Sequence, residues 1–282
     1  MALFKQVTIV GLGLIGGSLG MAMRRRKVAH TVVGLSRKSS TLRVAKRRGA
    51  IDVGTLDARQ AVRNADLVIL AIPVDLIVPH AMRLARMMRP GSVLMDVGST
   101  KAEIVRALDR RLSDRVLFVG AHPIAGSEQH GIEAADSHLF DRALCVLTPS
   151  SKTNRHVLAR ATRFWKALTC DVSVMSPAQH DRVLAATSHL PHLMAYALAS
   201  AVNASPLRQA PRSVLDMTRL AQSDPDLWDD IFFSNRAELL RAMQQFERSW
   251  GTVRRHLTQH NRAGLRQFLA RAQSRRHALQ DH

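Results

Sequence analysis

A glycine motif close to the N-terminus constrains the fold more than any other part of the sequence. The apolar run 7–10 ends at Gly11–Gly16, with the sequence GLGLIG, and a helical pattern follows from Leu14 to about Val28. This is the G-x-G-x-x-G pattern in the strand–turn–helix setting that a dinucleotide site requires. The three glycines permit a tight turn, a close approach of pyrophosphate and close helix packing, while the helix N-terminus offers free N–H groups. The motif predicts a Rossmann-like dinucleotide-binding domain.

The first half of the chain alternates apolar runs with stretches of helical spacing. Continuous apolar runs separated by helices indicate a parallel sheet covered on both faces. The last run is expected to form a mixed edge of that sheet. The predicted strands lie at 7–10, 31–35, 67–72, 93–95, 116–119, 144–147 and 172–175.

The pattern changes at Ser176-Pro177, which is typical of a helix N-cap followed by proline in the first turn. From there helical periodicity predominates, with helices expected at 177–202, 213–221, 225–257 and 262–279 and a loop at 203–212. A chain of 282 residues also suits about two domains. We predict a Rossmann-like NAD(P)-binding domain over 1–175 and an all-α domain over 176–282.

Charge and composition narrow the possible functions. A formal net charge of +19 favours anionic partners, such as nucleic acid, a membrane surface or carboxylated and phosphorylated small molecules. The uncharged segment 6–23 ahead of four basic residues resembles a membrane segment, but its five glycines argue against insertion. The two cysteines, Cys145 and Cys170, are predicted to be buried free thiols in a reducing compartment. We therefore expect a cytoplasmic protein without membrane contact.

The residues after the second predicted strand bear on cofactor choice. An acid at this position binds the ribose 2′-hydroxyl of NAD, but residues 34–41 read GLSRKSST and contain none. Hydroxyls and a guanidinium suit a 2′-phosphate, so NADP is predicted, with NAD possible and Arg37 as a plain solvated residue as the alternative. The expected cofactor-binding residues are Gly11, Gly13, Leu14, Ile15, Gly16, Ser36, Arg37, Ser40, Pro73 and Ser99.

Two predicted strand ends carry chemistry, as ligands in parallel sheets bind beyond the carboxyl ends of strands. The segments are 96–101, DVGSTK, and 121–128, AHPIAGSE. Pro123 favours an extended backbone at His122, which is placed to accept a proton. In the helical half, His189 and His192 share a face if the helix continues past Pro191, but no ligand set completes a metal site and none is predicted.

Together these motifs resemble the prephenate/arogenate dehydrogenase family of tyrosine biosynthesis. The resemblance runs through GLGLIGGSLG, DVGSTK, AHPIAGSE, SHLPH and DMTRLAQSDPDLW in order, over nearly the whole chain. It implies oxidative decarboxylation of prephenate (to 4-hydroxyphenylpyruvate, CO₂ and NADPH) or arogenate (to tyrosine). It also implies a homodimer formed through the helical domain.

The resemblance assigns roles to individual residues. His122 would be the base that takes the hydroxyl proton or a hydrogen-bond acceptor for it. Ser99 would hydrogen-bond near that hydroxyl and the nicotinamide, and Arg219 would pair with one of the substrate carboxylates. His192 and Glu128 are similar to members that accept prephenate, which is the favoured substrate. The expected substrate-binding residues are Arg219, Ser188, His189, His192, Glu128, Asp216 and Trp228, with Glu128 and Asp216 forming a polar gate near Arg219.

One stretch departs from the family pattern. Residues 211–215, PRSVL, replace a glycine-rich run that usually ends in an aromatic and a basic residue. Another NADP-dependent dehydrogenase of a carboxylated hydroxy substrate is therefore the main alternative. A basic nucleic-acid-binding protein or a non-catalytic NADP sensor are alternatives of other classes, and 4% aromatic residues without a nucleic-acid motif disfavour the former. No nucleic-acid partner is predicted.

Overall fold

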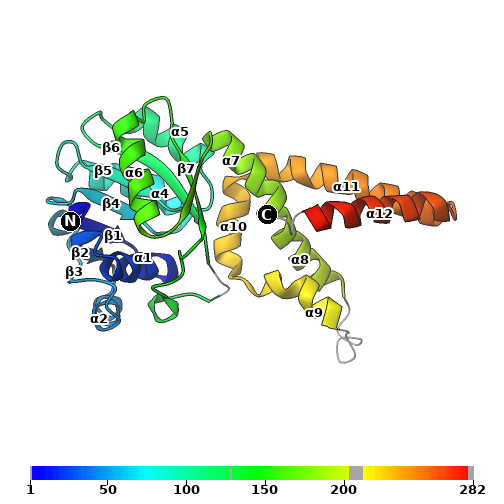
Figure 1. Cartoon of the computed structure of the whole chain (residues 1–282), viewed down its shortest axis with the longest axis horizontal. Helices are drawn as coiled ribbons and strands as arrows, with labels where there is room; N and C mark the ends of the chain where they lie inside the picture. Colours follow the sequence, from blue (N-terminus) through cyan, green and yellow to red (C-terminus); the bar gives the residue numbers. More distant parts are fainter. Residues whose placement is uncertain (1, 127–128, 203–211, 279–282) are drawn as a thin grey trace. The chain divides into compact units, whose positions relative to one another are not determined.

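The structure, a computed structural model, describes residues 2–126, 129–202 and 212–278. The chain forms two compact units, Met1–Asn235 and Arg236–His282. The first unit contains a sheet with helices on both faces and a further group of helices (Figure 1). The predicted division between 175 and 176 stays a prediction.

The described part of the first unit contains one eight-stranded sheet, with the order β3-β2-β1-β4-β5-β6-β7-β8. Neighbouring strands are parallel except for β6 and β7, which are antiparallel, so the predicted mixed edge is present. The three-residue strand β3 was not predicted. The strands are β1 Phe4–Val10, β2 Ala29–Leu35, β3 Val53–Thr55, β4 Leu67–Leu70, β5 Val93–Asp96, β6 Leu117–Ile124, β7 Leu144–Thr148 and β8 Asp171–Val174.

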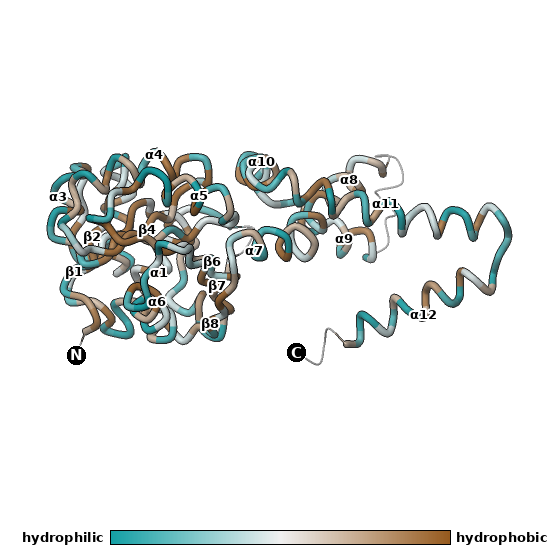
Figure 2. Tube along the Cα trace, turned by 90° about the horizontal axis from the view of Figure 1, so that it is seen from above, coloured by the Kyte–Doolittle hydropathy of each residue, from teal (hydrophilic) through white to brown (hydrophobic). Residues whose placement is uncertain are grey.

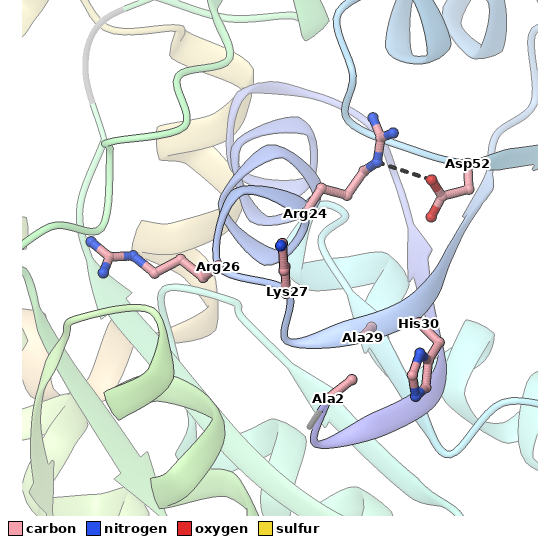
Figure 3. A pocket seen from close by; sticks show the side chains of 7 residues that line it. All are labelled: Ala2, Arg24, Arg26, Lys27, Ala29, His30 and Asp52. Atoms are coloured by element: carbon pink, nitrogen blue, oxygen red, sulfur yellow. Dashed lines mark ion pairs between the residues drawn. The ribbon is translucent and has the colours of Figure 1, made fainter.

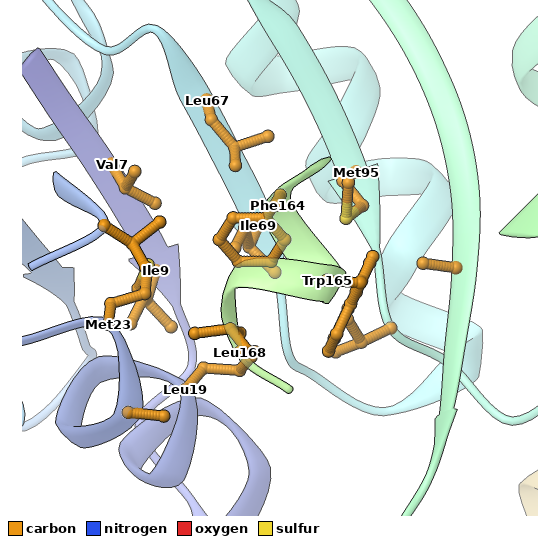
Figure 4. Close-up of a cluster of buried hydrophobic side chains, with 14 of the residues drawn as sticks. Val7, Ile9, Leu19, Met23, Leu67, Ile69, Met95, Phe164, Trp165 and Leu168 are labelled. Atoms are coloured by element: carbon orange, nitrogen blue, oxygen red, sulfur yellow. The ribbon is translucent and has the colours of Figure 1, made fainter. Parts of the chain in front are cut away.

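Alternation along the central strands divides the core into two layers. In β4, Leu67 and Ile69 belong to one buried cluster, and Val68 and Leu70 belong to the other. The first cluster, in which Val7, Ile9 and Met95 meet Leu19, Met23, Phe164, Trp165 and Leu168, is drawn in Figure 4. Each large side chain buried in this way contributes roughly 1.5–3 kcal/mol. The core therefore fixes the strand ends at which ligands are expected to bind.

The helices that cover the sheet follow the strands in turn. The uncharged segment 6–23 forms most of β1 and most of α1. Among the described residues, no helix combines the length and apolarity needed to cross a bilayer. The bounds are α1 Leu14–Arg25, α2 Ser39–Arg47, α3 Ala58–Val62, α4 Val74–Ala85, α5 Ala102–Arg111 and α6 Arg155–Ala167.

Two predicted long helices are interrupted. The expected helix 177–202 contains a π-turn at Ala185–His189, and the expected helix 225–257 is broken at Asn235. The predicted loop 203–212 lies outside the described residues except for Arg212, which begins a helix. The elements are α7 Pro177–Leu184, α8 Leu190–Ala201, α9 Arg212–Thr218, a 3₁₀ turn Arg219–Gln222 and α10 Pro225–Ser234.

The second unit is a helical hairpin of α11 (Arg236–Thr258) and α12 (Arg262–Ala278). Within its described residues, α11 buries Leu239 and α12 buries no residue. Figure 2 shows apolar residues spread along both helices between polar ones. Large apolar side chains exposed on them are Leu240, Trp250, Leu257 and Leu269.

Candidate active site

The glycine turn between β1 and α1 is shaped to receive a phosphate group. Gly11 has φ +90°, and a Cβ there would lie 2.3 Å from the carbonyl oxygen of Ala71. A Cβ on Gly16 would lie 1.9 Å from the carbonyl oxygen of Gly11, so both positions require glycine. A Cβ on Gly13 would meet nothing within 4 Å, and no side chain caps the helix that begins at Leu14. This open, uncapped helix N-terminus fits the pyrophosphate of a dinucleotide.

The other predicted cofactor residues lie beyond the carboxyl ends of β2 and β4. Ser36 is half-buried, and Arg37 and Ser40 are exposed at the start of α2. Pro73 is the N-cap residue of α4. Because β1, β2 and β4 are parallel neighbours, these segments share one edge of the sheet with the glycine turn. Leu14 and Ile15 are the first residues of α1.

The catalytic candidate His122 lies inside a strand, which corrects the prediction that it follows one. The pairing of β6 with β5 ends at Gly120, opposite Asp96, but its pairing with β7 continues to Ile124. Beyond Gly120 the strand therefore pairs with β7 alone. A strand that is paired on one side tolerates a proline, because proline has no N–H that needs a partner on the open side. His122 thus stays at the carboxyl edge of β5, where Ser99 also lies.

One side chain, that of His180, connects His122 to a carboxylate. Nδ1 of His122 lies 2.8 Å from Nε2 of His180, and Nδ1 of His180 lies 2.7 Å from Oδ1 of Asp181. Burial lowers the pKa of His122 well below its ordinary value, and the nearby His180, Lys101 and His189 lower it further. His122 is therefore neutral at physiological pH and able to accept a proton.

The turn that follows β5 is held by a buried ion pair. The Lys101 ammonium contacts the Asp96 carboxylate, and both side chains are fully buried. Burial raises the pKa of Asp96, although the Lys101 charge and the backbone N–H of Gly98 oppose this shift. The hydroxyl of Thr100 lies 2.7 Å from that of Ser234 at the end of α10. These contacts hold Gly98 and Thr100, so the half-buried Ser99 between them is fixed in place.

The π-turn brings His189 to the same region. His189 is buried, and its Nδ1 accepts a hydrogen bond of 3.1 Å from the side-chain amide of Asn235. The same amide donates to the main-chain oxygen of Asp181 at 2.7 Å. Burial lowers the pKa of His189 to about 4, so this ring is also neutral at pH 7. Its Nε2 must then carry the proton and act as a fixed donor.

The remaining predicted residues of α8 and α10 form an aromatic cluster. The ring of His192 stacks on Trp228 with centroids 3.5 Å apart, and His189 meets the same indole edge-on at 6.1 Å. Nδ1 of His192 donates to the main-chain oxygen of Ser188 at 2.9 Å. Burial lowers the pKa of His192, and the Arg219 charge lowers it further. Arg219 is exposed at the start of the 3₁₀ turn, which packs against α8.

Not every predicted site residue is brought into this group. Asp216 is exposed on α9, with no contact that identifies a gate. Glu128, the other member of the predicted gate, lies outside the described residues. Within the residues that are described, no group of His, Cys, Asp and Glu side chains is arranged to hold a metal ion.

Several residues of this arrangement were not found by sequence reasoning. His180 and Asp181 are adjacent on α7, which is a weak signal because exposed His–Asp pairs are common on helices. Asn235 was hidden inside a predicted long helix. Lys101 and Asp96 were part of a recognised motif, but their mutual pairing was not anticipated.

A surface hollow lies at the opposite edge of the sheet and does not belong to this site. Figure 3 shows Arg24 directed toward Asp52, with which it forms an ion pair of 2.9 Å, and Arg26 directed away. Because Ala2 and His30 lie at the amino ends of parallel strands, this hollow is on the side where ligands of such sheets do not bind.

Comparison with known proteins gives matches along almost the entire chain. Residues 19–174 match the family model "Prephenate dehydrogenase, nucleotide-binding domain", and residues 176–271 match "Prephenate dehydrogenase, dimerization domain". The chain is 35% identical to cyclohexadienyl dehydrogenase of Zymomonas mobilis over 256 residues, which are 87% of this chain and 86% of that protein.

Two solved structures are similar over their full length. Prephenate dehydrogenase from A. aeolicus, in complex with hydroxyphenyl propionate and NAD⁺, has a TM-score of 0.91 and 31% identity, with 98% of each chain covered. Synechocystis arogenate dehydrogenase has a TM-score of 0.85 and 28% identity, covering 97% of this chain and 99% of that one.

Proposed function

Because the chain belongs to the prephenate dehydrogenase family, we propose that it oxidises and decarboxylates prephenate, arogenate or both. One observation carries this proposal. A neutral histidine, His122, lies at the same end of the sheet as the dinucleotide turn and is influenced by the nearby His189, which contacts Trp228. A base and a cofactor cradle therefore lie at one end of the sheet, together with a group of histidine and tryptophan rings.

In the proposed reaction, the substrate ring carries a hydroxyl on one carbon and a carboxylate on the opposite carbon. The nicotinamide, when bound, supplies the hydride acceptor. His122 takes the hydroxyl proton as the carbon–hydrogen bond breaks and a ketone forms. The C–CO₂⁻ bond then cleaves, its electron pair moves through the ring to the ketone oxygen, that oxygen takes the proton back, and CO₂ and a phenol are released. A neutral histidine suits this step because a general base must be unprotonated to accept the proton. Ser99, held between Gly98 and Thr100, would orient the same hydroxyl.

The proposed substrate carries two carboxylates, and Arg219 would pair with one of them. A guanidinium binds a carboxylate through two parallel hydrogen bonds, which a lysine cannot reproduce. Trp228 and His192 would form the wall beside the ring. The formal charge of +19 would assist the approach of an anionic substrate. We favour prephenate over arogenate, as the motif around His192 is similar to members that accept it.

For the cofactor we propose NADP in preference to NAD. The loop beyond β2 presents Ser36, Arg37 and Ser40 and no acid over residues 34–41, which favours a 2′-phosphate. The similar A. aeolicus protein was solved with NAD⁺. NAD therefore remains a possible second cofactor.

We propose a homodimer formed through the helical region that matches a dimerisation domain. The apolar side chains exposed on α11 and α12, such as Trp250 and Leu257, support this because a second copy would cover them. A cytoplasmic location and the absence of a nucleic-acid partner stay predictions. The buried free thiols of Cys145 and Cys170 are compatible with a reducing compartment.

An initial-rate assay at about 340 nm, where reduced nicotinamide absorbs, tests the proposal. Prephenate and arogenate are each combined with NADP and with NAD. Turnover with at least one substrate is expected, with NADP the better cofactor. If cofactor binds but neither substrate turns over, the enzyme acts on another carboxylated alcohol, and the 211–215 departure marks that difference.

A further inference from the structure

Behind His122 lies a line of buried groups that ends at a carboxylate. His180 is fully buried and Asp181 is 2% exposed, so neither touches bulk water. The nitrogen-to-nitrogen distance of 2.8 Å and the nitrogen-to-oxygen distance of 2.7 Å are both those of good hydrogen bonds. The three side chains form a continuous path from the sheet edge into α7.

The Asp181 carboxylate fixes the direction of every bond in this path. Oδ1 accepts from the backbone N–H of Lys101, and Oδ2 accepts from that of Ala102, each at 2.8 Å, at the start of the ten-residue helix α5. A carboxylate that accepts hydrogen bonds at both oxygens has no proton to donate. It can therefore act only as an acceptor toward His180. Nδ1 of His180 therefore carries a proton.

The tautomer of His122 follows from this constraint. When His180 is neutral and protonated at Nδ1, its Nε2 has a lone pair and accepts. Nδ1 of His122 must then donate, and the lone pair of His122 resides on Nε2, the nitrogen not engaged with His180. This is the nitrogen required to receive a substrate proton.

We propose that His180 and Asp181 are positioning residues of the base, with His180 setting the tautomer of His122 and holding the proton that His122 removes from substrate. This inference rests on the proposed function. The substrate O–H bond breaks as its proton joins Nε2 of His122. The proton on Nδ1 of His122 passes to Nε2 of His180. His122 is then neutral, and the positive charge lies on His180 against the Asp181 carboxylate. When the C–CO₂⁻ bond cleaves and its electron pair moves to the ring oxygen, the two transfers reverse and the proton returns through Nε2 of His122 to that oxygen, so no proton is lost to water.

The surroundings favour charge on His180 over charge on His122. His122 lies in a buried setting that disfavours the imidazolium, whereas His180 contacts a carboxylate directly. The ionisable groups around this pair come from every packed element: Lys101 at the start of α5, Asp96 of β5, Asp181 of α7, His189 of the π-turn and Cys145 of β7.

Two substitutions separate positioning from proton storage. In His180→Gln, the amide oxygen replaces Nε2 as acceptor for His122 and the amide N–H₂ faces Asp181, but the side chain cannot hold a proton. We expect kcat to fall about tenfold with KM unchanged, and the acid limb of the kcat/KM profile to move about one unit to lower pH, because His122 then titrates alone. In His180→Leu the acceptor is also lost, and kcat is expected to fall about 100-fold or more.

The matched control is His30→Gln, which makes the same change at an exposed histidine on the opposite edge of the sheet. Its kinetics and pH profile should equal those of wild type. The proposal is overturned if His180→Leu retains wild-type kcat, or if His180→Gln leaves the pH profile unmoved.

A measurement without substrate keeps the test independent of turnover and of variant stability. Ring-¹⁵N-histidine NMR of the wild-type protein, with His122 assigned by the spectrum of His122→Asn, should show Nδ1 protonated and Nε2 unprotonated at neutral pH. The reverse tautomer overturns the inference. If prephenate and arogenate both fail to turn over, the proposed function fails while this spectrum still decides the inference.

Discussion

The side-chain amide of Asn235 bridges His189 and Asp181, donating one hydrogen bond to the histidine ring at 3.1 Å and one to the main-chain oxygen of Asp181 at 2.7 Å. Asn235 is 4% exposed, so both acceptors lose a partner without gaining water when the amide is removed. Asn235→Ala should therefore lower the free energy of unfolding by about 2–3 kcal/mol, measured in urea. Asn64→Ala, at an exposed asparagine, should change it by less than about 0.5 kcal/mol. Equal stability of the two variants would contradict this role.

In the glycine turn, cofactor affinity and stability of the fold are expected to depend on different glycines. Gly13→Ala adds a Cβ where no atom lies within 4 Å, at a φ of −84° that alanine adopts readily. The variant should keep its melting temperature, but its Kd for the dinucleotide should rise about tenfold or more because the methyl group occupies the phosphate approach. Gly16→Ala meets the Gly11 carbonyl and should destabilise the fold by about 2–4 kcal/mol. Unchanged cofactor affinity in Gly13→Ala would remove this turn from the binding site.

Cofactor preference should respond to the loop after β2. In Arg37→Asp a carboxylate replaces the guanidinium proposed to hold the 2′-phosphate. KM for NADP is expected to rise about 10–100-fold while KM for NAD changes little. Arg47→Asp makes the same charge change at the far end of α2 and serves as control. A parallel rise of KM for NADP in both variants would assign the effect to net charge alone.

Substrate affinity should depend on Arg219. Arg219→Ala is expected to raise KM for the dianionic substrate about 10–100-fold with a smaller change in kcat, because a charge-assisted pair to a carboxylate is lost. Arg212→Ala removes an exposed arginine from the start of α9 and should leave KM unaltered. Steady-state kinetics at fixed, saturating cofactor provide the comparison. A wild-type KM in Arg219→Ala would exclude this residue from the pocket.

Stability should decline in mild acid because of the buried neutral histidines. The folded-state pKa of His189 is lowered from 6.5 to about 4, so the unfolded chain binds more protons between these values. Stability is then fully present above pH 6.5 and falls as pH drops toward 4, by on the order of 3 kcal/mol for this group. Urea midpoints measured from pH 7.5 to 4.5 should decrease, and His189→Gln should flatten the slope. A slope that this substitution leaves unaltered would show that other groups govern it.

The resemblance and the fold class were both predictable from sequence, and both are confirmed: the chain has a Rossmann-like domain followed by a helical dimerisation domain of the prephenate dehydrogenase family. The glycine motif and the uniform apolar runs carry that information because they are local. The preference for NADP and the individual roles of the site residues remain predictions.

What sequence reasoning missed depends on contacts between distant segments. His122 was expected after a strand, but the antiparallel pairing with β7 extends β6 through it, and nothing local in AHPIAGSE specifies that partner. The contact between His122 and His180 joins β6 with α7 across 58 residues of sequence. Asn235 acts where helical periodicity continues without a break, so hydrophobic spacing alone could not separate α10 from α11.

The π-turn at Ala185–His189 has a consequence for the angular order of the histidines. In an uninterrupted α-helix of about 3.6 residues per turn, His180 and His189, nine positions apart, would project about 180° from each other. A wider turn unwinds that angle, and both rings can then serve neighbouring positions around His122. The π-turn holds one residue more than an α-helix needs for the same rotation, so a further residue inserted at 185–188 would turn His192 by about 100° away from Trp228, and this segment should tolerate substitutions better than insertions.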